Sequence, residues 1–152
     1  MLRTLAFFLA MLALPLLVLA PMAAASQPDT VAIETQKPFG PSSGTFSAVG
    51  TFTDAGTFAN TSFNASARGA PNFGIVHATQ LFEGASGSFT LRINVTFTFS
   101  DDPNVLLDKG TWAVIDGTGA YATLHGQGTI TGTENETTGI IRRTYTGSLI
   151  FS

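Results

Sequence analysis

The chain has 152 residues, with seven Lys and Arg against ten Asp and Glu, which gives a formal net charge of −3 at pH 7. Binding to nucleic acid or to an anionic membrane needs a basic surface, so this small number of cationic side chains argues against both. The absence of cysteine excludes thiol catalysis, disulfide exchange and every cysteine-based metal site.

The N-terminal segment has the three parts of an export signal. Arg3 supplies a positive charge, an apolar stretch runs from Leu5 to Ala20, and Ala23 to Ala25 form a small-residue cleavage motif before Ser26. We therefore predict a signal peptide over residues 1–25 and a mature protein that is secreted, periplasmic or at the cell surface. Loss of Arg3 leaves six basic and ten acidic residues, a net charge of −4.

Residues 26–43 contain three prolines and few apolar side chains, which predicts an extended leader with at most a short strand at Val31 to Thr35. From Gly44 onward the pattern changes to Thr, Phe and Gly with frequent two-residue alternation, the period of β-strands. After a first strand of this kind, Asp54 to Gly56 are expected to form a turn into a strand over Thr57 to Phe63.

The strand predicted over Ile75 to Glu83 has two equally plausible registers. In one register, His77 and Glu83 face the interior of the protein. In the other, the inward side chains are those of Val76, Ala78, Gln80 and Phe82. Both faces carry apolar and polar side chains, so the period alone leaves the choice open.

The clearest strand follows a turn at Gly84 to Gly87. Its apolar side chains alternate without exception with polar ones, and they are Phe89, Leu91, Ile93, Val95, Phe97 and Phe99. Such a strand has one buried face and one solvent-exposed face. Further strands are predicted over Gly110 to Asp116, Leu124 to Thr133 and Gly139 to Phe151.

These seven or eight strands, joined by short connections rich in Gly, Asp and Asn, indicate an all-β domain over residues 44–152. Consecutive hairpins build a meander, and closing the meander into a barrel removes its unpaired edges. We predict a single antiparallel eight-stranded β-barrel, with a β-sandwich as the alternative. Gly126, Gly128 and Gly132 fit a tightly coiled strand of such a barrel.

An acidic segment follows the clearest strand and contains Asp101, Asp102, Asn104 and Asp108. Oxygen ligands of this kind can hold Ca²⁺, but Asp and Asn also cap solvated turns, and we favour the turn. His77 and His125 have no partner at a familiar metal-ligand spacing. We therefore expect neither a metal nor a cofactor.

The C-terminal third contains several short Gly-rich and aromatic motifs: Gly110-Thr-Trp112-Ala-Val114, Asp116-Gly-Thr-Gly-Ala-Tyr121-Ala122, Leu124-His-Gly126-Gln-Gly128 and Tyr145-Thr-Gly147. These motifs resemble a bacterial secreted branch of the allene oxide cyclase barrel-like family, whose barrel is shared with the plant dirigent proteins. The resemblance implies an eight-stranded, often oligomeric barrel with an apolar lumen, in which Tyr121 would plug one end. If the protein is an enzyme, the resemblance implies a cyclase or isomerase, although the matching motifs carry no catalytic residue.

Polar residues on faces that one of the registers would turn inward are the candidates for chemistry. His77, Glu83 and Asp116 are the catalytic candidates, because a buried carboxyl or imidazole group beside an aromatic wall can act as an acid or base. In the alternative interpretation Asp116 is a turn residue at a strand end, and the other two lie in solvent. The candidate ligand contacts are Trp112, Phe97, Phe89 and Tyr121. Aromatic side chains of this kind equally form a filled core.

The function we predict is binding of a small apolar molecule in the barrel lumen. One alternative is a cyclase or isomerase that acts on an apolar substrate, mainly by positioning it. Another is a structural or interaction domain without a ligand. An outer-membrane barrel is disfavoured because the chain ends in Ser152, aromatic girdles are not evident and the outer faces are rich in Thr, so we expect no stable membrane insertion. A homo-oligomer is compatible with the resemblance.

Overall fold

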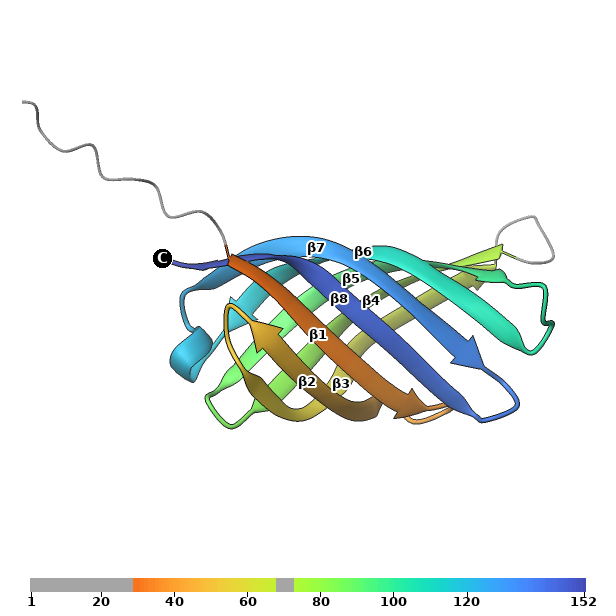
Figure 1. Ribbon diagram of the computed structural model, residues 1–152, viewed down its shortest axis with the longest axis horizontal. Coiled ribbons are helices and arrows are strands. Elements are labelled where there is room, and N and C mark those ends of the chain that lie inside the picture. The colour runs from red at the N-terminus through yellow and green to blue at the C-terminus, as the bar shows by residue number, and fades with distance from the viewer. Residues whose placement is uncertain (1–28, 68–72) are drawn as a thin grey trace, which may run out of the picture.

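A computed structural model describes residues 29–67 and 73–152, so the predicted signal peptide lies outside the described residues. The strands are β1 (Asp29–Pro38), β2 (Ser43–Gly50), β3 (Asp54–Ala67), β4 (Phe73–Gly84), β5 (Ser88–Phe99), β6 (Val105–Gly117), β7 (Leu124–Asn135) and β8 (Ile140–Phe151). They form a closed antiparallel barrel in which each strand pairs with its neighbours in the chain and β1 pairs with β8 (Figure 1). The predicted eight-stranded barrel is confirmed, and the alternative β-sandwich is wrong.

The barrel begins at β1, well before the boundary at Gly44 that the sequence suggested. β1 pairs with β2 on one side and with β8 along its whole length on the other. Val31, Ile33 and Thr35 alternate into the interior and are buried. The expected extended leader over residues 26–43 is therefore wrong from residue 29 onward. Closure explains the difference, because without β1 the edges of β2 and β8 would stay unpaired.

Asp54 is the first residue of β3, and not part of a turn as we expected. Its carboxylate is buried and accepts hydrogen bonds from the backbone amides of Ala55, Ala85 and Ser86 at 2.8, 3.0 and 3.2 Å. The side chain therefore ties the start of β3 to the turn between β4 and β5. Ala85 and Ser86 lie about thirty residues away in the chain, so local turn preferences could not reveal these two partners.

The register of β4 that the sequence left open is settled by burial. The inward side chains of β4 are those of Val76, Ala78, Gln80 and Phe82, all of which are buried. The neighbouring β5 buries Phe89, Leu91, Ile93 and Val95, as its alternation predicted. Phe97 is only partly buried and Phe99 is exposed, because β5 reaches the rim of the barrel at that end.

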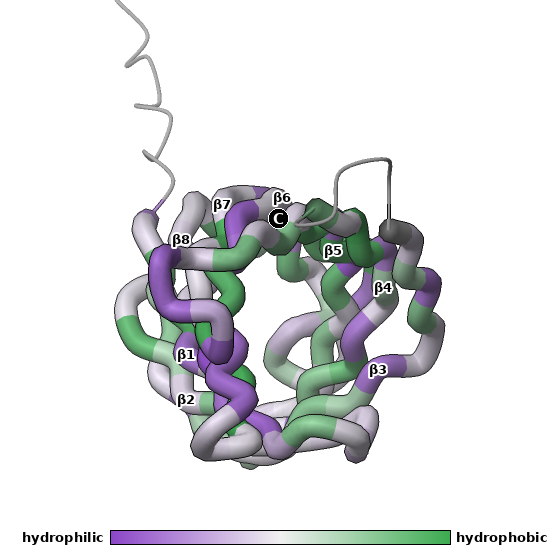
Figure 2. The backbone as a smooth tube through the Cα atoms, turned by 90° about the vertical axis from the view of Figure 1, so that its right-hand side faces the viewer, coloured by the Kyte–Doolittle hydropathy of each residue, from purple (hydrophilic) through white to green (hydrophobic). Residues whose placement is uncertain are grey.

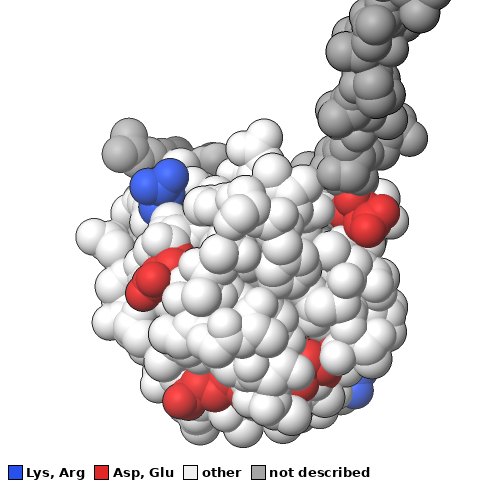
Figure 3. All heavy atoms as spheres, turned by 90° about the vertical axis from the view of Figure 1, so that its left-hand side faces the viewer, with Lys and Arg blue, Asp and Glu red and all other residues white. Residues whose placement is uncertain are grey.

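One end of the barrel, which we call the closed end, is filled by aromatic rings. The chain turns there through a short 3₁₀ helix, η1 (Gly119–Tyr121), which carries Tyr121 into the interior. Its ring packs against Phe52 and Phe89, and Phe89 stacks on Phe82 with ring centroids 4.8 Å apart. The Tyr121 hydroxyl donates a hydrogen bond of 2.5 Å to Asp54. Seen from outside, this end is a continuous surface of mostly uncharged atoms (Figure 3).

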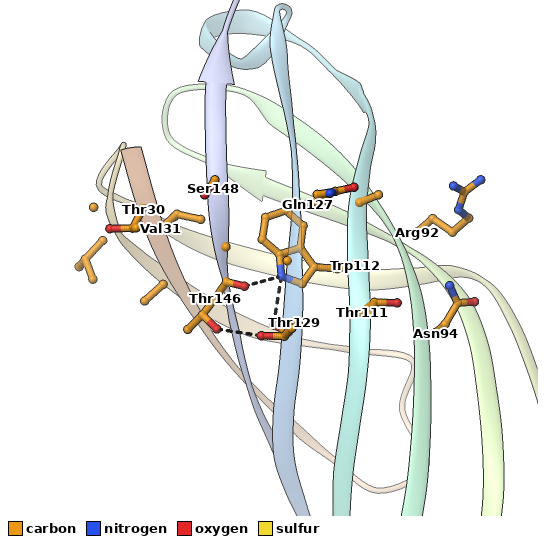
Figure 4. A pocket seen from close by; sticks show the side chains of 16 residues that line it. Thr30, Val31, Arg92, Asn94, Thr111, Trp112, Gln127, Thr129, Thr146 and Ser148 are labelled. Atoms are coloured by element: carbon orange, nitrogen blue, oxygen red, sulfur yellow. Dashed lines mark hydrogen bonds between the residues drawn. The ribbon is translucent and has the colours of Figure 1, made fainter. Parts of the chain in front are cut away.

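The inward glycines of β7 and β8 make space for large side chains from neighbouring strands. A Cβ atom on Gly147 would lie 2.7 Å from the indole ring of Trp112, and Gly128 stands between these two residues in the ladder. The Trp112 indole N–H donates to the carbonyl oxygens of Thr129 and Thr146 at 3.2 and 3.3 Å (Figure 4). The tightly coiled glycine strand expected from the sequence thus holds the buried indole.

Candidate functional site

A cavity of about 460 Å³ lies in the opposite end of the barrel, which we call the mouth. Figure 2 looks onto this end and shows the ring of strands that surrounds it. Lys37, Glu134 and Arg143, from the adjacent strands β1, β7 and β8, form one side of the cavity, the charged wall. The other side, the apolar wall, comes from the adjacent strands β3, β4 and β5 and consists of Phe63, Ala65, Val76 and Phe97. The cavity is therefore amphipathic.

The charged wall is built around a buried ion pair between β8 and β6. The Arg143 Nε donates to Asp108 Oδ2 at 2.6 Å, and its Nη2 donates to Glu134 Oε1, also at 2.6 Å. In the ladder, Gly132 of β7 stands between Asp108 and Arg143. A Cβ atom on Gly132 would lie 2.7 Å from the Arg143 Cγ, so the glycine is what lets the guanidinium group cross the strand.

Burial and charge act against each other in this cluster. Although burial alone disfavours a charged guanidinium group, the nearby carboxylate of Asp108 raises the pKa of Arg143, which keeps it cationic. Burial also raises the pKa of Glu134, and the charge of Asp108 adds to this effect despite the opposing charge of Arg143. Glu134 is thus an acid beside the cavity that holds its proton more strongly than it would in water.

Asp108 has one oxygen without a partner. Its side chain is fully buried, and no donor within residues 29–67 and 73–152 reaches its Oδ1 atom. An unpaired buried acceptor is costly, and its presence calls for an explanation. Arg143 bonds to the carboxylates of both Asp108 and Glu134, and the proximity of Asp108 is one of the causes that raise the pKa of Glu134. A proton on Glu134 would supply the missing donor.

Lys37 lies at the rim of the charged wall. Its Nζ donates to the carbonyl oxygens of Pro38 and Pro41 at 3.2 and 3.0 Å, which anchors the turn between β1 and β2. Partial burial, and then the positive charge of Arg143, lowers the pKa of Lys37, whereas Glu134 opposes that change. The rim therefore carries a second cation within the electrostatic reach of the acid.

A chain of hydrogen-bonded polar side chains leads from the cavity, which Asn60 lines, into the buried interior of the barrel. The hydroxyl of the fully buried Tyr145 donates to Gln80 Oε1 at 2.7 Å, and Gln80 Nε2 donates to Asn60 Oδ1 at 2.9 Å. A β-bulge in β3 between Asn60 and Ser62 shifts the pairing with β4 by one residue. Because a bulge changes which side chains share a face, Asn60 and Phe63 both line the cavity although they are three residues apart.

The apolar wall depends on a second glycine. Phe97 of β5 pairs with Gly74 of β4, and a Cβ atom on Gly74 would lie 2.0 Å from the Phe97 ring. The ring therefore rests on the backbone of the neighbouring strand, where it covers one side of the cavity. Phe63 is 61% exposed at the rim, which is unusual for a phenylalanine and leaves apolar surface available to a ligand.

The three catalytic candidates from the sequence all lie on the outside of the barrel. His77, Glu83 and Asp116 are exposed, so none of them faces the lumen. The His77 Nδ1 is 2.6 Å from the side-chain oxygen of Asn94. Asp116 accepts a hydrogen bond from the Gly117 amide at 2.9 Å, which agrees with the alternative role as a strand-end turn residue.

Of the four expected ligand contacts, the structure places only Phe97 at the cavity. Trp112, Phe89 and Tyr121 belong to the packed core. Sequence reasoning missed Arg143, Glu134 and Lys37 as lining residues. The signal for the first two was the strand period, because Arg143 alternates with the buried Ile141 and Tyr145, and Glu134 shares its face with Ile130.

The acidic segment also divides in a way that the sequence did not suggest. Asp101, Asp102 and Asn104 lie exposed at the turn between β5 and β6, where Asp102 caps the Asn104 amide at 2.9 Å. Asp108 instead points into the barrel and pairs with Arg143. Among the residues that the structure describes, no group of three His, Asp or Glu side chains is placed to hold a metal ion.

A larger hollow of about 1120 Å³ lies on the outer surface (Figure 4). Its lining mixes exposed threonines (Thr30, Thr111 and Thr129) with small apolar residues and glycines, and Arg92 is its one charged lining residue among those described. It faces solvent and contains no buried ionisable group. We therefore take the mouth cavity as the candidate functional site.

In comparisons with models of known protein families, with curated protein sequences and with solved structures, no match to this chain was found. The class that the fold and the site define is an eight-stranded antiparallel β-barrel with one closed end and one amphipathic mouth. The resemblance to the allene oxide cyclase barrel-like family stays a prediction. None of the helical residues described here forms a segment with the length and apolarity needed to cross a membrane.

Proposed function

We propose that this protein binds a small, largely apolar molecule in the mouth of its barrel. The observation that carries the proposal is the cavity between the charged and apolar walls. Its volume of about 460 Å³ falls within the range of about 300–1,000 Å³ that is usual for small-molecule sites. An apolar lining with a few convergent polar groups is also the usual composition of such sites.

Burial patterns further support this location over the rest of the lumen. The aromatic rings of the closed end pack against one another, and Tyr121, Phe82 and Phe89 are almost completely buried. At the mouth, by contrast, Phe63 and Phe97 keep accessible surface. A ligand that covered these two rings would remove apolar area from water, which is the main source of affinity for an apolar molecule.

The test is binding of the uncharged dye N-phenyl-1-naphthylamine, whose fluorescence rises in an apolar site. Ala65→Trp places a large ring in the cavity and should abolish the fluorescence increase. Asn64→Trp is the matched control, because the adjacent side chain of β3 is opposite His77 on the outer face. Equal dye binding by both variants would refute the cavity as the site, and no binding by the unmodified protein would favour the structural role.

A second candidate function is isomerisation of a bound carbonyl compound. The observation that favours it is Glu134, an acid with a raised pKa that lines the cavity beside the cations Lys37 and Arg143. The ionised carboxylate would take a proton from carbon next to the carbonyl group, and the cations would stabilise the enolate that results. Deuterium exchange into 2-decanone in D₂O, measured by mass spectrometry, should be faster with the protein than with Glu134→Gln. Equal rates would refute this second function.

A further inference from the structure

We propose that the ligand of the mouth cavity is an anionic amphiphile of medium chain length, and that its binding is coupled to uptake of a proton by Glu134. This inference rests on the proposed binding function and specifies the chemical class of the ligand. Three observations carry it: the separation of charged and apolar walls, the excess of cations at the cavity surface, and the unpaired oxygen of Asp108.

The charges at the cavity surface indicate whether the ligand is anionic or cationic. Two cations, Lys37 and Arg143, line the cavity, and Glu134 is the one acid among the described lining residues. Asp108 lies behind Arg143 with a fully buried side chain, so it balances the guanidinium charge without facing the cavity. Among the described residues, no carboxylate lies within salt-bridge distance of Lys37. An anionic headgroup placed against the charged wall could therefore pair with Lys37.

The apolar wall and the volume constrain the rest of the ligand. The headgroup and the apolar tail would lie on opposite sides of one cavity, because the two walls come from opposite strands of the closed barrel. Asn60 lines the cavity and is hydrogen-bonded to the buried Gln80, which accepts from the buried Tyr145, and packed aromatic rings fill the core of the barrel. A single short or medium alkyl chain fits these limits better than a long chain that would have to thread the barrel.

Charge balance then requires a proton. The titratable groups around Glu134 are Lys37 from β1, Asp108 from β6, and Arg143 with the buried Tyr145 from β8. The described lining contributed by β3, β4 and β5 contains no ionisable side chain. With both acids ionised, the cluster has two positive and two negative charges, so an added anion leaves an excess negative charge in a partly desolvated site. Protonation of Glu134 restores neutrality.

The structure also offers a place for that proton. Asp108 Oδ1 is a buried acceptor without a donor in the described part of the chain, and the carboxyl groups of Asp108 and Glu134 are held together by their bonds to Arg143. A proton on Glu134 would donate to this oxygen while Arg143 continues to bind the other oxygen of Asp108. In the bound state, Asp108 Oδ1 would then have a hydrogen-bond donor, which it lacks when Glu134 and Asp108 are both ionised.

The experiment uses three ten-carbon probes and isothermal titration calorimetry between pH 5.5 and 7.5. Decanesulfonate stays anionic over this whole range, so any pH dependence belongs to the protein. Decanol is the neutral probe and decyltrimethylammonium is the cationic one. We expect decanesulfonate to bind most tightly, and its affinity to rise towards low pH by up to about tenfold per pH unit for one coupled proton. Phosphate and Tris differ in their heat of ionisation. The difference between the binding enthalpies measured in these two buffers therefore gives the number of protons taken up.

Two pairs of variants assign the effects to residues. Glu134→Gln should bind decanesulfonate at every pH as tightly as the unmodified protein does at low pH, and it should take up no proton. Glu136→Gln, at an exposed position, should change neither the pH dependence of the affinity nor the proton uptake. Lys37→Met should weaken decanesulfonate binding more than decanol binding, and the exposed Lys109→Met serves as its control. Unchanged pH dependence in Glu134→Gln would overturn the coupling.

The outcomes also separate this inference from the proposed function. If decanol or the ammonium probe binds as tightly as decanesulfonate, and Lys37→Met has no effect, the anionic ligand class is refuted while a binding site remains. If none of the three probes binds and the uncharged dye does not bind, the proposed function itself fails.

Discussion

Replacing Arg143 with methionine should destabilise the protein far more than the same change at the neighbouring Arg142. Arg143 is 8% exposed and bonds to Asp108 inside the barrel, whereas Arg142 points outward and bonds to Gln36 at 3.0 Å. Without Arg143, the buried carboxylate of Asp108 would lose both its counter-charge and the one hydrogen-bond donor that it has among the described residues. Breaking a buried ion pair from one side costs about 3–5 kcal/mol, and changing an exposed arginine costs within about 0.5 kcal/mol.

The free energy of unfolding can be measured by urea titration with tryptophan fluorescence, because the single tryptophan, Trp112, is 2% exposed. A loss of about 3–5 kcal/mol is a large part of the total stability of a small domain, which is about 5–15 kcal/mol. If Arg143→Met does not fold, the double variant with Asp108→Leu still tests the reasoning. It removes both charges and should recover most of the loss. Equal losses for Arg142→Met and Arg143→Met, or a double variant as unstable as Arg143→Met, would refute the reasoning.

Three further predictions concern the mouth and the closed end of the barrel. Gly132→Ala places a Cβ atom 2.7 Å from the Arg143 Cγ, and we expect the overpacking to cost about 1–3 kcal/mol in the same urea titration; a neutral result would mean that the glycine gap is not required. Tyr121→Phe removes the hydroxyl that donates to the buried Asp54, and should lower the unfolding free energy by about 1–3 kcal/mol and the Tm accordingly. Because burial raises the folded-state pKa of Glu134, its stabilising contribution is present below its unfolded pKa and is lost as the pH rises through the folded pKa. In Glu134→Gln the unfolding free energy should therefore fall less steeply as the pH rises between these two pKa values. Unfolding titrations from pH 4 to 8 with equal slopes for the variant and the unmodified protein would contradict this.

Much of the fold could be predicted because burial in a β-sheet follows the local period of two residues. The alternation along Phe89 to Val95 identified a half-buried strand and its inward face correctly. Where alternation was weak, prediction failed. The inward face of β4 contains Gln80, and that of β1 contains only Val31, Ile33 and Thr35 between polar flanks, so the sequence left one register open and placed β1 outside the barrel.

The candidate site was less predictable than the fold. His77, Glu83 and Asp116 attracted attention as ionisable groups beside apolar residues, but in each case the side chain points to solvent. Arg143 and Glu134 occupy inward positions of their strands, which the period allowed. When a charged side chain falls on the predicted inward face of a strand, the usual conclusion is that this face points to solvent instead, because an unpaired buried charge is costly. Only the presence of a partner on another strand makes such a position acceptable.

An all-β meander of hairpins follows from the sequence, because strand period and turn composition are local properties. The position of the candidate site depends on how distant strands pair. Asp108 and Arg143 are 35 residues apart, and they meet because the register of three strands places Gly132 between them. Lys37 joins the same wall only because β1 closes the barrel against β8. Cross-strand register and closure are set by the pairing of the whole sheet, and no local segment specifies them.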